Sequence, residues 1–205
     1  TCLNKLTPYI FRKEDQGILI HNYEDGEKVE PINFLPIIPT ILINGCLGIG
    51  TGFKSFIPSH NPLEIISDLI DRLEGNFKKL NINPWYRGFT GEIEKIDDNH
   101  YETKGKIQID GNIVYITDLP IGKWSFDYKE FIGKKTEIID YDAFNTDIRV
   151  YFKLVFEEET ITKLINDNKL LSDLKLIDKI NMNNMYLYSK TEEHLILRKF
   201  HSIED

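Results

Sequence analysis

A glycine-rich segment around a single isoleucine is the part of this sequence whose residue types most clearly indicate chemistry. It runs Asn44-Gly45-Cys46-Leu47-Gly48-Ile49-Gly50-Thr51-Gly52-Phe53. Glycine tolerates positive φ angles and lets another molecule approach the backbone closely. Three uses fit such a segment: backbone N–H groups that cradle phosphates, a tight structural turn, or the presentation of Ile49 as an apolar wedge.

The spacing of the glycines argues against a nucleotide cradle. A dinucleotide fingerprint requires G-x-G-x-x-G directly before a helix, and a P-loop requires G-x-x-x-x-G-K-[ST]. The pattern here is Gly45-x-x-Gly48-x-Gly50-x-Gly52, and the next helix cannot begin until after Pro58. From the residues alone, the structural turn and the wedge both remain open.

Five ordered motifs resemble the DNA breakage-reunion core of a type IIA DNA topoisomerase. The first motif is the glycine segment with its flanks Val29-Glu30-Pro31, Pro36-Ile37-Ile38-Pro39 and Ile57-Pro58. The second is Asn61-Pro62-x-Glu64-Ile65, and the third is Pro84-Trp85-Tyr86-x-Gly88-Phe89-x-Gly91. The fourth is Asp118-Leu119-Pro120-x-x-x-Trp124, and the fifth is Thr146-Asp147. The resemblance spans nearly the whole chain. The third motif is typical of the eukaryotic and large-virus branch rather than of bacterial gyrase.

The resemblance implies that double-stranded DNA is the partner, and we expect five residues to contact it. Ile49 matches an isoleucine that wedges between base pairs, and Trp124 matches a tryptophan that contacts DNA. Lys54 and Lys123 adjoin these two residues, and Asn44 opens the glycine motif. We expect Ile49 to be exposed at a loop tip, and the Trp124 indole N–H to reach a phosphate while its ring packs on a sheet.

Four of these residues also have a purely structural interpretation. Ile49 could insert into a distant core pocket, because burying an isoleucine is favourable by about 1.5–3 kcal/mol. Trp124 could be a half-buried anchor for its loop. Scattered lysines such as Lys54 and Lys123 are usually solvated surface groups.

The resemblance places the catalytic machinery outside this sequence. The family's catalytic tyrosine precedes a stretch similar to Thr1-Cys2-Leu3-Asn4-Lys5-Leu6, so we expect the nucleophile just upstream of Thr1 and none of the ten tyrosines here to be catalytic. We find no acidic D-x-D cluster of the kind that holds magnesium in the family's metal-binding domain, and no ATPase signature. We therefore predict neither a catalytic residue nor a metal ligand here, and expect this fragment alone to be non-catalytic.

The parent enzyme implied by the resemblance is an ATP-hydrolysing isomerase. It passes one duplex through a transient double-strand break in another and requires Mg²⁺ and ATP. We expect a nuclear homodimer, or a protein of the viral factory or cytoplasm if the source is a large DNA virus. This fragment would supply the surface on which the cleaved duplex lies and bends.

Composition agrees with a folded part of such an enzyme. With 205 residues, of which 41% are hydrophobic, the chain can bury a sizeable core. Its formal charge of −8 argues against strong autonomous affinity for DNA, since phosphate contacts depend on Lys and Arg. No apolar run approaches the 18 or so residues of a membrane span, so no membrane partner is expected. Cys2 and Cys46 suit a reducing compartment.

Hydrophobic patterning predicts an α+β fold. Residues 37–43 read as a buried strand, and Asn61-Pro62-Leu63-Glu64 reads as a helix start. The helix carries an apolar stripe expected to be core, formed by Ile65, Ile66, Leu69, Ile70 and Leu73, and it ends at Gly75. The other expected elements are a turn at 24–27, alternating strands over 89–117 with a turn at 110–112, a strand over 149–156, a helix over 157–171, a strand over 184–189 and a helical stripe within 191–205.

We expect three regions along the chain. Residues 1–39 form the C-terminal part of a winged-helix domain, and residues 40–189 form a tower or shoulder domain with an antiparallel sheet and flanking helices. Residues 190–205 begin the helix that leads to an exit-gate coiled coil. Two other classes stay open, a stand-alone architectural DNA-binding domain and a structural interaction domain in which Ile49 packs inside. The net acidity disfavours the first and the ordered motifs disfavour the second.

Overall fold

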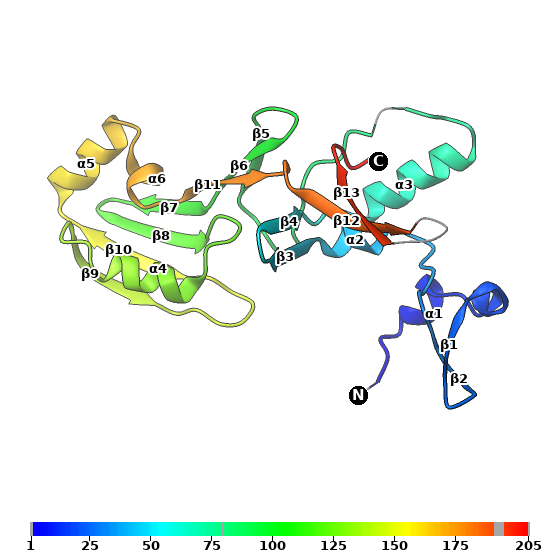
Figure 1. Cartoon of the computed structure of the whole chain (residues 1–205). Helices are drawn as coiled ribbons and strands as arrows, with labels where there is room; N and C mark the ends of the chain where they lie inside the picture. Colours follow the sequence, from blue (N-terminus) through cyan, green and yellow to red (C-terminus); the bar gives the residue numbers. More distant parts are fainter. Residues whose placement is uncertain (1, 79, 191–194, 205) are drawn as a thin grey trace.

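A computed structural model describes residues 2–78, 80–190 and 195–204 as an elongated arrangement of small sheets and short helices (Figure 1). In chain order the elements are α1 (Thr7–Ile10), a 3-10 helix (Lys13–Ile18), β1 (His21–Glu24), β2 (Glu27–Pro31), α2 (Thr40–Asn44), β3 (Cys46–Gly50), β4 (Phe53–Ile57), α3 (Pro62–Leu73), β5 (Glu92–Lys95), β6 (His100–Lys104), β7 (Lys106–Asp110), β8 (Ile113–Asp118), α4 (Ser125–Ile132), β9 (Ile138–Ala143), β10 (Phe152–Phe156), α5 (Glu158–Asn166), α6 (Leu170–Asp173), β11 (Ile177–Asn181), β12 (Met185–Lys190) and β13 (Leu195–Phe200).

The described strand pairs are all antiparallel, which confirms the α+β expectation. A four-stranded sheet has the order β7-β8-β10-β9, and a three-stranded sheet has the order β11-β6-β5. The remaining strands form the two-stranded pairs β1-β2, β3-β4 and β12-β13. The alternating pattern predicted for residues 89–117 becomes β5 to β8.

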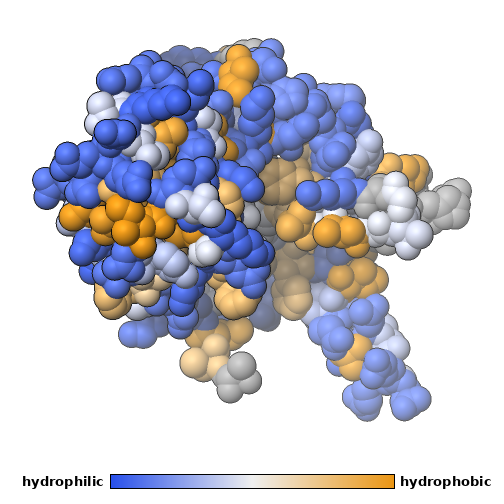
Figure 2. All heavy atoms as spheres, turned by 90° about the vertical axis from the view of Figure 1, so that its left-hand side faces the viewer, coloured by the Kyte–Doolittle hydropathy of each residue, from blue (hydrophilic) through white to orange (hydrophobic). Residues whose placement is uncertain are grey.

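The four-stranded sheet and helices α4, α5 and α6 enclose the larger core at one end of the molecule. Strands β8 and β10 alternate between buried and less buried residues, as period-2 patterning requires. Helix α4 packs on this sheet through Tyr128, whose ring lies 5.2 Å from that of Phe152. Seen from this end, the surface is mostly hydrophilic with a local cluster of hydrophobic groups (Figure 2).

A second core cluster lies in the middle of the molecule. Its buried members are Ile57, Tyr101, Ile180, Met182 and Met185. They come from β4, β6, β11, β12 and the segment between the last two strands. This cluster therefore ties the β3-β4 pair to the three-stranded sheet and to β12.

Two predicted elements are wrong in type. The run over 37–43 was expected to be a strand, but residues 40–44 form helix α2, which begins after Pro39 and ends with a hydrogen bond from the Gly45 N–H to the Ile41 carbonyl (3.0 Å). Ile41 and Leu42 pack against the second cluster, so tertiary packing overrides the β-branched propensity.

The other error is the helical stripe expected near the C-terminal end. Residues 195–200 form strand β13, which pairs with β12 from Met185 opposite Phe200 to Lys190 opposite Leu195. Backbone pairing with β12 decides this conformation. The rest of that expectation includes residues 191–194 and 205, which lie outside the described residues.

Two other predicted elements need smaller corrections. The strand expected over 149–156 is confirmed as β10, which begins at Phe152. The helix expected over 157–171 is interrupted, since α5 ends at Asn166 and α6 begins at Leu170. Asn168 lies between them with φ +53°, a left-handed conformation that a continuous helix excludes.

Helix α3 begins and ends where its sequence predicts. The Asn61 side chain accepts a hydrogen bond from the Leu63 N–H (3.0 Å), and Gly75 follows the helix with φ +88°. The expectation that its whole apolar stripe is core is wrong. Ile65 is only 4% exposed, whereas Ile70 is 50% exposed and Leu73 is 88% exposed.

The N-terminal region lacks a core of its own. No described residue between 2 and 38 is buried, and α1, β1 and β2 project away from the rest of the chain (Figure 1). Its exposed large hydrophobic residues are Leu3, Leu6, Tyr9, Ile18, Ile20, Tyr23, Ile32, Phe34, Leu35 and Ile37. Among the described helices, none is long and apolar enough to cross a membrane.

Candidate nucleic-acid interface

The glycine segment forms a β-hairpin that displays Ile49. Strands β3 and β4 pair with Ile49 opposite Lys54 and Gly50 opposite Phe53, and Thr51-Gly52 make the turn with Gly52 at φ +89°. Ile49 is 81% exposed. Its predicted exposure is confirmed, but it lies on a strand beside the turn rather than in a loop. The alternative in which Ile49 packs inside the protein is wrong.

Alternation along the hairpin explains this exposure. Opposite residues of an antiparallel pair point to the same face, and so do residues two apart on one strand. Leu47, Ile49 and Lys54 therefore share the outer face, where Leu47 is 62% exposed. On the inner face, Ser55 and Ile57 are buried.

The hairpin is held to β12 through the side chain of Ser55. The Ser55 hydroxyl donates to the Tyr186 carbonyl (2.6 Å) and accepts from the Tyr186 N–H (3.1 Å). The neighbouring Phe56 N–H donates to the Asn184 carbonyl (2.8 Å). These bonds fix the base of the hairpin, so the tip carrying Ile49 projects from a rigid support.

Gly45 determines how the chain passes from α2 into β3. Its φ of +69° lies in the region that favours glycine, and a Cβ at this position would lie 2.7 Å from the Ile57 carbonyl oxygen. Asn44, immediately before it, is exposed, and its backbone carbonyl accepts a hydrogen bond from the Ser59 hydroxyl (2.9 Å). The Asn44 side chain is thus available to a ligand beside the base of the hairpin.

Trp124 lies immediately before α4 and is exposed. It is the N-cap residue of that helix and follows a turn in which the Lys123 N–H donates to the Pro120 carbonyl (3.1 Å) and Gly122 has φ +88°. Trp124 is 74% exposed. The interpretation of Trp124 as a half-buried anchor is wrong, and little of its ring is covered by a sheet. Its indole is free to stack on or donate to a ligand.

Lys123 is tied within the protein. Its ammonium group donates to the Asp178 carboxylate on β11 (2.8 Å). Partial burial opposes ionisation of Asp178, but the hydrogen bonds from Lys123 and from the Lys179 N–H outweigh it and keep the pKa of Asp178 below its usual value. Lys54, in contrast, is exposed, and no ion pair among the described residues involves it.

One core cluster supports both predicted contact segments. Cys46 and Phe56 from the hairpin and Ile121 from the turn before Trp124 all pack against the second core cluster. The described residues contain no group of three or more His, Cys, Asp or Glu side chains placed to hold a metal ion. Through the exposed side chains of Ile49, Trp124 and Lys54, this surface can offer apolar insertion, aromatic contact and a cation.

A protein-family model for the A subunit of DNA gyrase/topoisomerase IV matches residues 1–203. The chain belongs to the type IIA DNA topoisomerases. It is 37% identical over 201 residues to DNA topoisomerase 2 of Arabidopsis thaliana, covering 93% of this chain and 14% of that protein. It is 38% identical over 195 residues to DNA topoisomerase 2 of Plasmodium falciparum, covering 92% of this chain and 14% of that protein.

A solved structure gives the same assignment at the level of the fold. The crystal structure of the Plasmodium falciparum topoisomerase II DNA-binding, cleavage and re-ligation domain matches with a TM-score of 0.85 and 35% sequence identity. The match covers 97% of this chain and 27% of that chain. The topoisomerase chain described here thus spans only a small part of the proteins it resembles.

The topoisomerase fold shows what the sequence missed at this surface. Leu47 is a further exposed apolar residue on the face of Ile49, and its position two residues earlier in a strand was the available signal. Two further residues shape this surface from within the protein. Ser55 holds the hairpin, and Asp178 holds the side chain of Lys123. No local pattern predicts them, because their partners lie 131 and 55 residues away in sequence.

Proposed function

We propose that this chain is part of the surface of a type II topoisomerase on which the cleaved duplex lies, and that Ile49 bends the DNA by wedging between base pairs. The carrying observation is an isoleucine that is 81% exposed beside the turn of a hairpin whose base is fixed by Ser55. Unstacking a base step costs a few kcal/mol, which the additional contacts of bent DNA offset.

The groups around Ile49 have complementary roles in this proposal. Lys54 shares the outer face of the hairpin and contacts a phosphate, and Asn44 lies beside the hairpin base. Trp124 contacts the duplex through its exposed indole. Lys123 holds the turn before Trp124 through Asp178 and contributes less to DNA binding than Lys54 does. The net charge of −8 fits a surface that binds DNA together with other parts of the enzyme.

We further propose the setting in which this surface works. The parent enzyme is an ATP-dependent homodimer of the nucleus that uses Mg²⁺, with the metal, ATP and the catalytic tyrosine bound or supplied by other parts of the polypeptide. Residues 1–39 complete a winged-helix domain, for which the many uncovered apolar side chains of this region are the support. Residues 40–189 form the tower or shoulder domain.

Substitution of Ile49 in the parent enzyme tests the wedge. Ile49→Ala should reduce the bending of a duplex labelled at both ends with a fluorescence-transfer pair, and should reduce cleavage, while the melting temperature stays nearly unchanged. The matched control is Ile148→Ala, since Ile148 is 97% exposed in the turn between β9 and β10. Normal bending by the Ile49→Ala enzyme would refute the proposal.

A further inference from the structure

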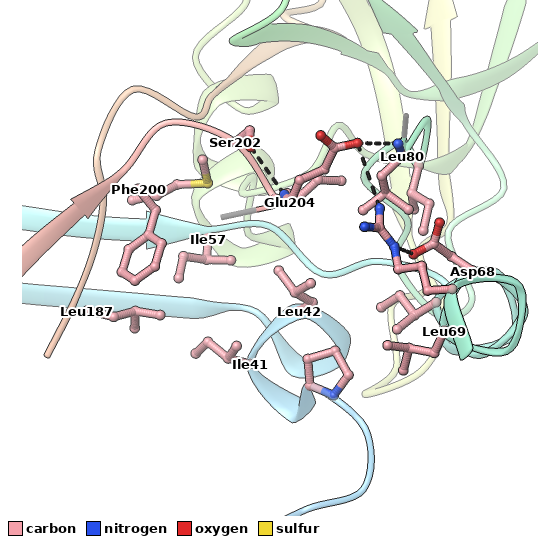
Figure 3. Close-up of a pocket in the computed structure, with 16 residues that line it drawn as sticks. Ile41, Leu42, Ile57, Asp68, Leu69, Leu80, Leu187, Phe200, Ser202 and Glu204 are labelled. Atoms are coloured by element: carbon pink, nitrogen blue, oxygen red, sulfur yellow. Dashed lines mark hydrogen bonds and ion pairs between the residues drawn. The ribbon is translucent and has the colours of Figure 1, made fainter. Parts of the chain in front are cut away.

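Helix α3 has two adjoining apolar stripes, an inner face that meets the core and an outer face that is mostly exposed. The inner face carries Ile65 and Leu69, which line a cavity of about 390 Å³ between α2, α3 and the β12-β13 pair (Figure 3). The outer face carries Leu63, Ile66, Ile70 and Leu73, which we call the α3 seam. Leu63 is 74% exposed, Ile70 50% and Leu73 88%, while Ile66 is half-buried.

The spacing of the α3 seam is that of a helix-helix contact. Steps of three, four and three residues keep the four side chains in one narrow stripe along a helix. The same alternation of three and four residues places apolar side chains between two packed helices in a coiled coil. An exposed stripe of this kind can pack against the apolar stripe of a second amphipathic helix.

Polar residues, mostly acidic, run along one side of the α3 seam. The residues that directly follow the four seam positions share one flank of the stripe, and they are Glu64, Ser67, Asp71 and Glu74. Three of these four carry a carboxylate, and none carries a positive charge. A helix that covers the seam would pair favourably with this flank if it carried Lys or Arg beside its own apolar stripe. The charge pattern therefore specifies the chemistry of the occupant.

The C-terminal residues of the chain already lie against α3. The Glu204 carboxylate accepts a hydrogen bond from the Leu80 N–H and lies 3.9 Å from the Arg72 guanidinium (Figure 3). Arg72 in turn bonds to Asp68 one helical turn earlier (2.5 Å). Ser202 and Ile203 line the cavity beside Leu69. These contacts bring the end of the described chain next to the helix that carries the seam.

We propose that the α3 seam is covered by an amphipathic helix of the parent polypeptide outside residues 1–205, with a 3–4 apolar repeat and a basic flank. The parent supplies ample chain for this, since the present sequence covers 14% of the Arabidopsis relative and 27% of the solved Plasmodium core. Leaving three large aliphatic side chains in water is unfavourable, and a second helix removes that cost. The proposal is independent of DNA binding.

Site-resolved protection of α3 tests the proposal without any DNA. Peptide-resolved hydrogen exchange of the unmodified proteins should show amides of residues 66–74 exchanging at least tenfold more slowly in the parent polypeptide than in the 205-residue chain. A Leu73→Cys thiol, followed by mass spectrometry of its peptide, should react with maleimide at least tenfold more slowly in the parent. Ile148→Cys is the matched control and should react equally fast in both.

The acidic flank is tested by reversing its charge. Asp71→Lys with Glu74→Lys should bring the labelling rate of the Leu73→Cys thiol in the parent close to the rate of the same variant in the 205-residue chain. Comparing parent with chain removes the direct effect of nearby lysines on thiol reactivity. Glu158→Lys with Glu159→Lys on α5 is the control and should leave the thiol protected in the parent. Full protection despite reversal of the flank would overturn the basic character of the occupant.

Two further results would overturn the proposal as a whole. Equal exchange of the α3 amides in the parent and in the 205-residue chain would show that no part of the parent covers the seam. The proposal would then be wrong even if a different protein binds there. Protection that rises with the concentration of the 205-residue chain would show that the occupant is a second copy of this segment.

Discussion

Ile49 and Lys54 are direct cross-strand partners at the end of the β3-β4 hairpin. Because opposite residues of an antiparallel pair project from the same face, the apolar side chain of Ile49 and the cationic side chain of Lys54 point out from the protein side by side. Insertion of Ile49 between bases would place Lys54 next to the phosphates that flank the opened step. The hairpin register thus places the residue proposed to deform the DNA beside a residue that can neutralise phosphate charge.

The two lysines near the predicted contacts should differ in their effect on DNA binding. In the parent enzyme, Lys54→Met should weaken DNA binding for all sequences. It should also make the negative slope of log affinity against log salt concentration shallower by about 1, as for the loss of one phosphate contact. Lys123→Met should change the slope by less, because Lys123 is held by Asp178 at 2.8 Å. Titration of a labelled duplex at several salt concentrations measures both. Equal slopes for the two variants would contradict this assignment.

Ser55→Ala should destabilise the chain. The substitution removes the hydrogen bonds that the Ser55 hydroxyl makes with the N–H and the carbonyl of Tyr186, at a cost of about 1–3 kcal/mol. Urea unfolding of the 205-residue chain measures the loss. Ser172→Ala is the control, since Ser172 is exposed and its hydroxyl donates to the Lys169 carbonyl within its own turn. A loss no larger than that of the control would mean that Ser55 does not anchor the hairpin.

Gly45→Ala should be more damaging than another Gly→Ala change. The new Cβ would lie 2.7 Å from the Ile57 carbonyl oxygen in a backbone conformation with φ +69°, so α2 and the hairpin must shift apart. Gly17→Ala is the matched control, because nothing lies within 4 Å of a Cβ built there. Melting temperatures should fall by several degrees for Gly45→Ala and hardly change for Gly17→Ala. Similar values for both would show that Gly45 is not constrained.

The stability of the chain should fall in mild acid through His60. This residue is 1% exposed, its Nδ1 lies 3.1 Å from the Leu42 carbonyl, and burial lowers the pKa of its imidazole below the usual 6.5. The unfolded chain therefore binds a proton more readily than the folded chain, and the free energy of unfolding decreases as the pH falls below about 6.5. Urea unfolding between pH 7.5 and 5 measures this slope.

His60→Gln separates this effect from other titrations. The variant should be less stable at neutral pH, since the imidazole is fully buried, but its stability should depend less on pH between 7.5 and 5. The comparison uses the slopes rather than the absolute free energies. An unchanged slope would assign the pH dependence to other groups.

The sequence predicted the local elements whose cause is local. Helix α3 follows from Asn61 and Pro62 at its start and Gly75 after its end, and the strands β5 to β8 follow from alternating side chains. The ordered motifs identified the family, and the resemblance to that family indicated the exposure of Ile49. These features depend on residues close together in the chain.

Only the tertiary structure decided the remaining features. Residues 40–44 became helical because Ile41 and Leu42 pack on a core built from distant strands, and residues 195–200 became a strand because β12 pairs with them. Lys123 is tied to Asp178, and Ser55 to Tyr186, by partners that no local pattern specifies. Propensity differences amount to about 1 kcal/mol or less per residue, so packing and hydrogen bonds with remote segments outweigh them.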